Sequence, residues 1–392
     1  MLSSTPDSPP RQLSSCYVSV PCPSSISPVA LCPRLTSRAC ASFDQLVLRT
    51  ATNILRLDLD SFPLHACALL TLPMRHGGFG LRRMEATAPA AFLGSLAAAA
   101  RYLPSAELLV SIPMIGELEH ALSRCQLPGL KLPAPSVFLA CAARQRPTAL
   151  QRSITAAIED SLAVSVGDSH ALSSHLLSLR QAGASNWLTT VPSRPEFTLP
   201  NDDFRLAARL RLRLPPVTET FVTRCGCGSE LSPDHFLVCR HLMRRSVTFR
   251  HSIILQLLVS FLREAGLQPI PEARTEDGER PDLRLVLDGA RLLLDVSVTH
   301  PVSPSALSSG RGSRPLGAAR QREHEKKYKY AELATREEST VIPLVLESTG
   351  ALAEGFQQFI RRISSRIRDG EFAGASPLGI ERFLVTALAI AL

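Results

Sequence analysis

The sequence predicts a mixed protein in which an α-helical region precedes a small α/β domain with a short mixed sheet. Between residues 43 and 215, apolar residues recur at three- and four-residue spacing, which is typical of amphipathic helices. Two apolar runs then flank Asp288-Gly289, which is a strong signal for a β-hairpin. A helix, a buried strand and a closing helix follow, so we expect residues 246–370 to form the α/β domain and residues 371–392 to form a C-terminal helix or tail.

The N-terminal region differs from the rest of the chain in composition. Residues 1–42 are rich in Ser and Pro. Such a segment buries too little apolar surface to offset the entropy that it loses on ordering, and we expect it to be disordered. The expected helices of the region that follows cover residues 44–57, 86–102, 106–122, 148–164, 169–179 and 202–212.

The overall composition limits the classes of partner. The chain has 43 Lys plus Arg, 35 Asp plus Glu and a net charge of +8, which favours polyanionic partners. No run reaches the roughly 18 apolar residues that a membrane span needs, so we expect no membrane partner. The ten cysteines lack the even spacing of a disulfide framework, and no signal peptide precedes them. These features indicate a reducing, intracellular compartment.

Residues 220–245 contain a cluster of side chains that can bind a metal. Cys225 and Cys227 precede His235 and Cys239, and the last two are four residues apart, which is about one turn of a helix. Three thiolates and an imidazole can complete a tetrahedral zinc site. We therefore expect these four side chains to bind a structural Zn²⁺, with His241 as an alternative ligand. The other interpretation is a linker with three small buried cysteines.

A basic segment surrounds this cluster. Nine arginines and three acidic residues lie between residues 205 and 250. Such a segment can follow a phosphate backbone, and its binding then weakens steeply as the salt concentration rises. A solvated helix face explains some of these arginines equally well. We expect the contacts with nucleic acid to come from Arg244, Arg245, Arg250 and His251.

The hairpin predicts a pair of facing carboxylates. If Asp288-Gly289 is a two-residue turn, Leu285 faces Leu292, and the same register places Asp282 opposite Asp295. Two carboxylates in such a pair stand roughly 5 Å apart and repel each other. A cation such as Mg²⁺ offsets the repulsion, and without it the substitution Asp295→Asn is expected to raise stability. A four-residue loop would break this register, and an edge residue plus a chance buried acid is the alternative.

The use of lysine points to a segment that follows the hairpin. Only four of the basic residues are Lys, and three of these lie in Lys326-Lys327-Tyr328-Lys329-Tyr330. A compact ammonium can approach a phosphate or a water where a planar guanidinium does not fit. An ordinary solvated helix face is the alternative, because acidic residues precede Lys327 and Lys329 by four positions. This explanation does not apply to Lys326, because the residue four positions before it is Arg322 and not an acid.

These residues together resemble a known class of nuclease. The order Arg-Pro-Asp282, then Asp295-Val-Ser, then Lys326-x-x-Lys329-Tyr330 resembles the PD-(D/E)xK nucleases, and more specifically the restriction-like endonuclease of site-specific non-LTR retrotransposons. In that family the lysine lies on the helix after the second strand, and a zinc knuckle precedes the nuclease. The chain departs from the family pattern in having one residue between Cys225 and Cys227, where two or more are usual.

The resemblance extends toward the N-terminus. The string Leu72-Pro73…Gly77-Gly78-Phe79-Gly80-Leu81-Arg82 and the segment 185–188 resemble the region that follows the polymerase in the same proteins, so the likeness covers most of residues 46–392. The adjacent pair Asp202-Asp203 opens an expected helix and is expected to cap it. We therefore expect no reverse transcriptase active site in this chain.

The resemblance implies a metal-dependent DNA endonuclease that nicks chromosomal DNA in the nucleus to prime reverse transcription. Asp282 and Asp295 would hold Mg²⁺, while Lys326 or Lys329, with Tyr330, would act on the attacking water and the phosphate. Another chain would supply the polymerase, and the RNA of the element is a further candidate partner. The alternatives are a non-catalytic nucleic-acid-binding remnant that keeps the zinc knuckle and the basic face, and a decayed fragment without function.

Overall fold

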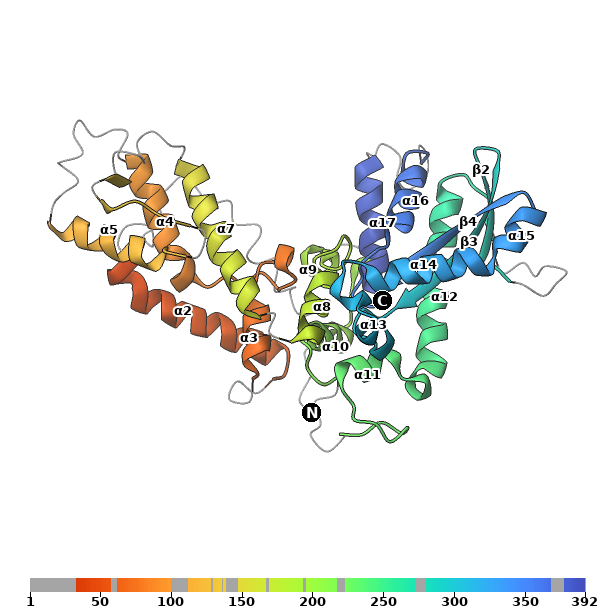
Figure 1. Ribbon diagram of the computed structural model, residues 1–392, viewed down its shortest axis with the longest axis horizontal. Helices are drawn as coiled ribbons and strands as arrows, with labels where there is room; N and C mark the ends of the chain where they lie inside the picture. The colour runs from red at the N-terminus through yellow and green to blue at the C-terminus, as the bar shows by residue number, and fades with distance from the viewer. Residues whose placement is uncertain are drawn as a thin grey trace, which may run out of the picture. The chain divides into compact units, whose positions relative to one another are not determined.

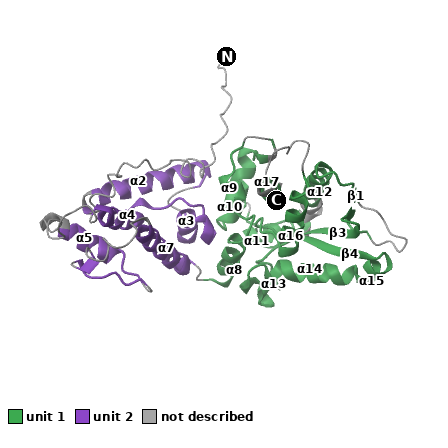
Figure 2. Ribbon diagram, turned by 90° about the horizontal axis from the view of Figure 1, so that it is seen from above, with its two compact units in different colours: residues 1–15, 169–392 green, residues 16–168 purple. Residues whose placement is uncertain are grey.

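A computed structural model of the chain shows two compact units, which meet in the sequence between residues 166 and 169 (Figure 2). The segment 169–216, which the sequence analysis grouped with the helical region, belongs to the unit that holds the sheet. None of the helices in the described residues combines the length and the apolar composition that a membrane crossing requires. The structure describes residues 33–57, 62–99, 112–127, 130–135, 137–138, 147–166, 169–192, 195–216, 223–271, 280–367 and 377–391.

The described helices and 3₁₀ turn of residues 33–166 form the helical unit (Figure 1), which is unit 2 in Figure 2. Helix α2 begins before the boundary expected at residue 42, so residues 33–42 are helical, and residues 1–32 lie outside the described part. The elements of this unit are α2 (Pro33–Ile54), α3 (Leu64–Thr71), the 3₁₀ turn η2 (Met74–His76), α4 (Met84–Ala99), α5 (Ile112–Arg124) and α7 (Pro147–Val166).

Helix α4 is the centre of this unit. Its N-terminus is capped by another helix, because the Asp44 carboxylate of α2 accepts hydrogen bonds from the backbone N–H groups of Met84 (2.7 Å) and Glu85 (3.0 Å). Phe92 and Leu93 of α4 are buried in a cluster with side chains of α5 and α7. Pro89 lies within α4 and weakens it, and burial of the apolar face of α4 offsets this loss.

The glycine-rich string after α3 forms a turn that is held against α7. Arg75 and Arg82 both form ion pairs with the Glu159 carboxylate of α7, at 2.7 and 2.8 Å. A Cβ atom added to Gly78 would lie 2.0 Å from the carbonyl oxygen of Leu72, so only glycine fits at this position. Packing within the helical unit is thus sufficient to explain why the sequence has this glycine-rich string.

The sheet unit, which is unit 1 in Figure 2, contains a four-stranded mixed sheet with the order β1-β2-β3-β4. The pairs β1/β2 and β2/β3 are antiparallel, and the pair β3/β4 is parallel. The small mixed sheet and the mostly helical remainder agree with the predicted fold class. The strands are β1 (Ile270–Pro271), β2 (Leu283–Leu287), β3 (Ala290–Thr299) and β4 (Ser339–Glu347).

Helices surround this sheet (Figure 1). Helices α12, α16 and α17 contribute to the apolar cluster on one face, and α14 and α15 form the crossover between the parallel strands. The helical elements are α8 (His170–Leu179), α9 (Asn186–Thr189), η4 (Pro195–Phe197), α10 (Asn201–Arg211), α11 (Pro233–Val238), α12 (Arg240–Glu264), α13 (Pro304–Ser308), η5 (Arg311–Ser313), α14 (Gly317–Lys329), α15 (Ala331–Arg336), α16 (Glu354–Ser364) and α17 (Pro377–Ala391).

The hairpin has the register that the sequence predicts. Asp288 and Gly289 both have positive φ, at 55° and 78°, as a two-residue turn of the hairpin type requires. Leu285 pairs with Leu292, and β2 begins with the pair Leu283–Leu294. This register puts the apolar residues of both strands on the face that α12, α16 and α17 cover.

Two contacts join the segment 169–216 to the sheet. The Ser178 hydroxyl donates to the Glu347 carboxylate of β4, and the backbone N–H of Leu352 donates to the carbonyl of Ala182 (3.0 Å).

A buried polar network then holds the segment together. The Arg211 guanidinium donates to the carbonyl of Ala184 (2.9 Å) and to the hydroxyl of Ser185 (2.8 Å). His175 donates through Nε2 to the Arg211 carbonyl (2.9 Å), and burial lowers the pKa of its ring to about 3. Asp202 and Asp203 lie in the first turn of α10, where carboxylates interact favourably with the helix dipole.

Candidate active site and metal cluster

The site forms where β3 extends beyond β2. Strand β3 continues to Thr299, but its partner begins only at Leu283, after a proline that has no N–H to contribute to the ladder. The first residue of β3 beyond the hairpin pairs is Asp295, whose carboxylate is on the α14 side. The N–H of Val296 donates to Asp282 Oδ2 (2.7 Å). The side chain of Asp282 therefore takes the place of a further strand residue.

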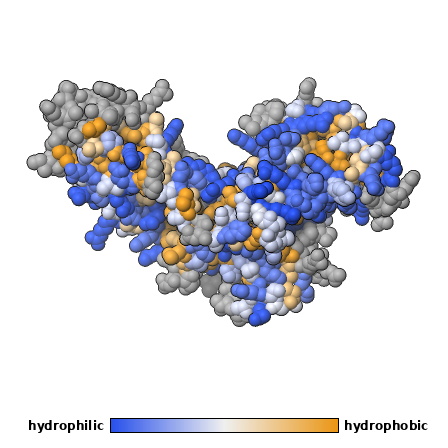
Figure 3. Space-filling model, in the orientation of Figure 1, coloured by the Kyte–Doolittle hydropathy of each residue, from blue (hydrophilic) through white to orange (hydrophobic). Residues whose placement is uncertain are grey.

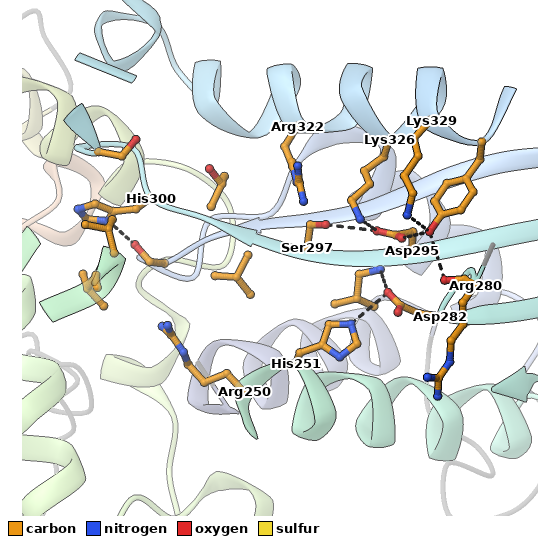
Figure 4. Close-up of a pocket in the computed structure, with 18 residues that line it drawn as sticks. Arg250, His251, Arg280, Asp282, Asp295, Ser297, His300, Arg322, Lys326 and Lys329 are labelled. Carbon is orange, nitrogen blue, oxygen red and sulfur yellow. Dashed lines mark hydrogen bonds and ion pairs between the residues drawn. The ribbon is translucent and has the colours of Figure 1, made fainter. Parts of the chain in front are cut away.

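A pocket of about 540 Å³ opens along this end of β3. Figure 4 shows that α12 forms one wall, α14 forms the opposite wall, and the carboxylates of Asp282 and Asp295 lie between them. Among the described lining residues, these two are the only acids. The other polar residues of the lining include Arg250, His251, Ser297, His300, Arg322, Lys326, Lys329 and Tyr330.

Asp295 is held by three side chains. Lys326 Nζ lies 2.7 Å from Asp295 Oδ2, and the Tyr330 hydroxyl donates to Oδ1 (2.8 Å). The hydroxyl of Ser297 adds a weaker contact to Oδ2 at 3.3 Å. The side chain of Asp295 is only 4% exposed and that of Lys326 13%, so this is a buried ion pair. An acid and a base that are 31 residues apart in the sequence meet here because α14 crosses β3.

Asp282 has a basic partner of its own. His251 Nε2 lies 3.1 Å from Asp282 Oδ2. The hydrogen bond that this carboxylate accepts from the imidazole raises the pKa of His251 above its ordinary value. His251, which the sequence analysis assigned to nucleic-acid binding, is therefore in direct contact with a carboxylate of the pocket.

The three neighbouring lysines have different positions. Lys326 contacts the carboxylate, whereas Lys329 Nζ donates to the Tyr330 hydroxyl (2.9 Å) and lies 4.4 Å from the centre of its ring. Lys327 is exposed and does not line the pocket. The structure thus distinguishes Lys326 as the lysine in direct contact with Asp295, whereas Lys329 contacts Tyr330.

The pocket offers carboxylate oxygens, which are the type of ligand that Mg²⁺ prefers. Mg²⁺ binds proteins through one or two carboxylates and keeps several waters, and Asp282 and Asp295 supply two carboxylates in one pocket. The predicted repulsion between the two carboxylates leaves out their basic partners, because Lys326 pairs with Asp295 and His251 forms a hydrogen bond with Asp282. A divalent cation at this place would compete with Lys326 for Asp295 Oδ2.

The four predicted zinc ligands do lie together. The sulfur atoms of Cys225 and Cys227 lie 3.6 and 3.8 Å from that of Cys239, and the Cys227 sulfur lies 3.3 Å from His235 Nε2. Zinc–sulfur bonds of about 2.3 Å in a tetrahedron place two sulfurs about 3.8 Å apart. All four ligand atoms lie within 4.8 Å of one another. The cluster could therefore hold a metal ion such as zinc.

Local structure explains this arrangement. A turn with Gly228 at φ 88° brings the backbone N–H of Cys225 to the Ser229 carbonyl (2.9 Å). The Ser229 side chain and backbone lower the pKa of the Cys227 thiol to about 6, which favours the thiolate that binds metal. Ser232 caps α11, so His235 and Cys239 are separated by one helical turn, as predicted.

The single residue between the first two cysteines also has a structural reason. A Cβ atom on Gly226 would lie 2.7 Å from His241 Nε2, so the His241 ring packs against a glycine. Among the described residues, His241 is not part of the group of metal-ligating atoms. Its predicted role as an alternative ligand is therefore not supported by this geometry.

The arginines of the basic segment 205–250 differ in what they contact. Arg250 lines the pocket, whereas Arg244 and Arg245 lie on α12 with side chains outside the described part of the structure. Arg211 is buried and bonded within the fold, and Arg213 pairs with Asp234 through two hydrogen bonds of 3.0 and 2.6 Å. Part of the basic segment is thus structural and is not available to phosphates.

Two residues of the pocket wall were not predicted from the sequence. His300 is the first, and its Nε2 donates to Asp234 (3.1 Å), which is next to His235 in the sequence, while its other ring nitrogen lies 2.7 Å from the Ser348 hydroxyl. This chain of contacts joins the metal cluster to the end of β3. Arg322 is the second contributor, and its signal was its position one turn before Lys326 on the same helix.

Comparison with known proteins does not add to this picture. No protein-family model matches the chain, and no curated protein matches it. The pocket and the metal cluster are therefore the basis on which a function can be assigned.

Proposed function

We propose that the chain is a metal-dependent DNA endonuclease module, similar to the restriction-like endonuclease of site-specific non-LTR retrotransposons. The observation that carries this proposal is the meeting of Asp282, Asp295 and Lys326 in one pocket. The three residues come from the segment before β2, from β3 and from α14. Two carboxylates and a lysine with basic surroundings are the side chains that hydrolysis of a phosphodiester requires.

Each residue has a role in the proposed reaction. Asp282 and Asp295 would hold Mg²⁺, which supplies an activated water and neutralises charge on the phosphate. The ammonium of Lys326 stabilises the negative charge that develops as the water oxygen bonds to phosphorus and the bond to the leaving oxygen breaks. Tyr330 holds Asp295 in orientation through its hydroxyl, and Lys329 holds Tyr330.

The zinc cluster and the partners complete the proposal. Zn²⁺ bound by the three cysteines and His235 would stabilise the segment that joins α10 to α12. Nicking of chromosomal DNA would prime reverse transcription in the nucleus, with the polymerase on another chain and the RNA of the element as a second ligand. These biological steps follow from the resemblance in the sequence, and the pocket supports the chemistry.

A nicking assay tests the proposal. Supercoiled plasmid is incubated with the wild-type chain with and without Mg²⁺, and with Asp295→Asn and Lys326→Met. We expect nicking only with the wild type and metal, with losses of at least about 100-fold in the variants. Lys327→Met is the matched control, because Lys327 is exposed on the same helix and should leave nicking unchanged. Nicking that persists in Asp295→Asn would exclude this pocket as its source.

A non-catalytic nucleic-acid-binding protein is the second candidate. One observation favours it: both carboxylates already have basic side chains as partners, so neither depends on a metal for a polar contact. Binding of DNA in EDTA, combined with no cleavage and no change in melting temperature on addition of Mg²⁺, would favour this candidate over the nuclease.

A further inference from the structure

The pocket continues beyond the two carboxylates. From Asp295 its lining follows β3 through Ser297 and Thr299 to His300, and these residues contribute hydroxyl groups and an imidazole but no further acid. Ser297 is two residues from Asp295, which is about 6.6 Å along a strand. Leu237, Val238 and Val298 add apolar surface to the lining, and the charged side chains that the described residues contribute beyond Asp295 are cations.

Arg250 forms one side of this part. Its side chain lies in the pocket wall, and burial lowers the pKa of its guanidinium from the ordinary value. Among the described residues, no carboxylate forms an ion pair with Arg250 and no hydrogen bond from its guanidinium is present. A partly buried cation without a counter-ion is costly, and a bound anion would offset that cost.

Arg322 forms the opposite side. It lies on α14 one turn before Lys326, so both side chains are directed to the same face of the helix. Figure 4 shows Arg322 extending from α14 toward Ser297, while Arg250 extends from α12 on the other side of the pocket. Arg322 donates through Nη1 to Glu325 (3.0 Å), and its remaining N–H donors are available to a ligand.

We propose that Arg250 and Arg322 form a second anion subsite, which binds one phosphate of a nucleic-acid strand next to the phosphate at Asp282 and Asp295. This inference rests on the proposed function, because it adds a position for the substrate of the same pocket. Two planar guanidinium groups from opposite walls suit the several oxygens of one phosphate, which can accept hydrogen bonds from both. Neither arginine touches the reacting atoms, so both act by positioning the strand.

The size of the pocket limits how much of the substrate enters it. A volume of about 540 Å³ is that of a site for a small ligand, so only a short stretch of one strand's backbone can enter. A single-stranded oligonucleotide presents such a backbone and is therefore a sufficient probe of the subsite.

Salt dependence of binding tests the proposal. The probe is a fluorescent single-stranded oligodeoxynucleotide of mixed sequence, titrated in EDTA with the wild type, Arg250→Gln, Arg322→Gln and the double variant. Each phosphate contact contributes about 0.7 to the slope of log K against log salt for a single strand. Because both arginines hold one phosphate in this proposal, the double variant should lose about 0.7 of slope, and a loss of about 1.4 would indicate two separate phosphates and overturn the shared subsite.

The affinities give a second criterion. A shared phosphate predicts that the loss in the double variant is smaller than the product of the two single losses. Additive losses, or a slope unchanged in the double variant, would overturn the proposal. Arg322 has a side chain that is 43% exposed, so its replacement leaves the fold intact even if Arg250→Gln is unstable. In that case Arg322→Gln alone must lower the slope, and an unchanged slope refutes the subsite.

Matched controls separate this subsite from a diffuse basic surface. Arg320 lies on α14 and Arg263 lies on α12, and both are exposed outside the pocket. Arg320→Gln and Arg263→Gln should leave the slope within the error of the wild type, and an equal decrease in these controls would overturn the proposal. Because the titrations contain no divalent metal, a chain that cleaves nothing can still pass this test. Failure of the nuclease and failure of the subsite are therefore distinguishable.

Discussion

The substitution Asp295→Asn should destabilise the protein strongly, because it leaves the buried ammonium of Lys326 without its partner. The two groups are 2.7 Å apart, and their side chains are 4% and 13% exposed. Removing one member of a buried ion pair costs about 3–5 kcal/mol, and the partial exposure of Lys326 favours the lower end of about 3 kcal/mol. For a unit of this size, such a loss lowers the melting temperature by about 6–12 °C.

The assay is thermal or denaturant unfolding in EDTA, so that no metal enters the comparison. The double variant Asp295→Asn/Lys326→Met should recover to within about 1 kcal/mol of the wild type, because no buried charge remains unpaired. Lys327→Met is the surface control and should change stability by less than about 0.5 kcal/mol. Stability of Asp295→Asn equal to or above the wild type would refute the reasoning and restore the repulsion that the sequence alone predicts.

Three further predictions concern the metals and pH. Lys326→Met should bind Mg²⁺ more tightly, because the ammonium no longer competes for Asp295. Tenfold tighter binding raises the stabilisation by Mg²⁺ by about 1.4 kcal/mol, and an Mg²⁺ titration of the melting temperature that is unchanged from the wild type would contradict this. The chain should contain about one zinc by metal analysis and lose it in Cys239→Ser, whereas equal zinc content in both would exclude the cluster. Stability should fall as the pH falls through 6.5, because the unfolded chain protonates His175 while the folded chain, with a pKa of about 3, does not. The slope from this group is about 1.4 kcal/mol per pH unit, and chemical unfolding at several pH values should show a shallower decline in His175→Gln.

Features that depend on neighbours in the sequence were predictable. The Asp288-Gly289 turn determines the register of the hairpin, because two residues with positive φ permit only one pairing of the strands that they join. The spacing of His235 and Cys239 predicts one helical turn, and α11 provides it. Helix positions in both units also follow from apolar periodicity, although their ends differ by several residues.

Features that depend on distant contacts were decided only by the tertiary structure. Spacing alone could not distinguish Lys326 from Lys329, because which lysine reaches Asp295 depends on how α14 crosses β3. The pairing of His251 with Asp282 likewise requires α12 to lie beside the start of β2. Hydrophilic residues dominate the sequence of α14 and its visible surface (Figure 3), so its pattern gives no sign that one lysine is buried.

The boundary between the two units shows the same limit. The helices of residues 169–216 have the amphipathic pattern of those before them, and a local pattern reports which face of a helix is apolar but not what that face packs against. Their place in the sheet unit depends on contacts such as the hydrogen bond from Ser178 to the buried Glu347 of β4, and these two residues are far apart in the sequence. Local backbone preferences thus determined the elements and the hairpin register, whereas burial and pairing of charges across the fold determined the site.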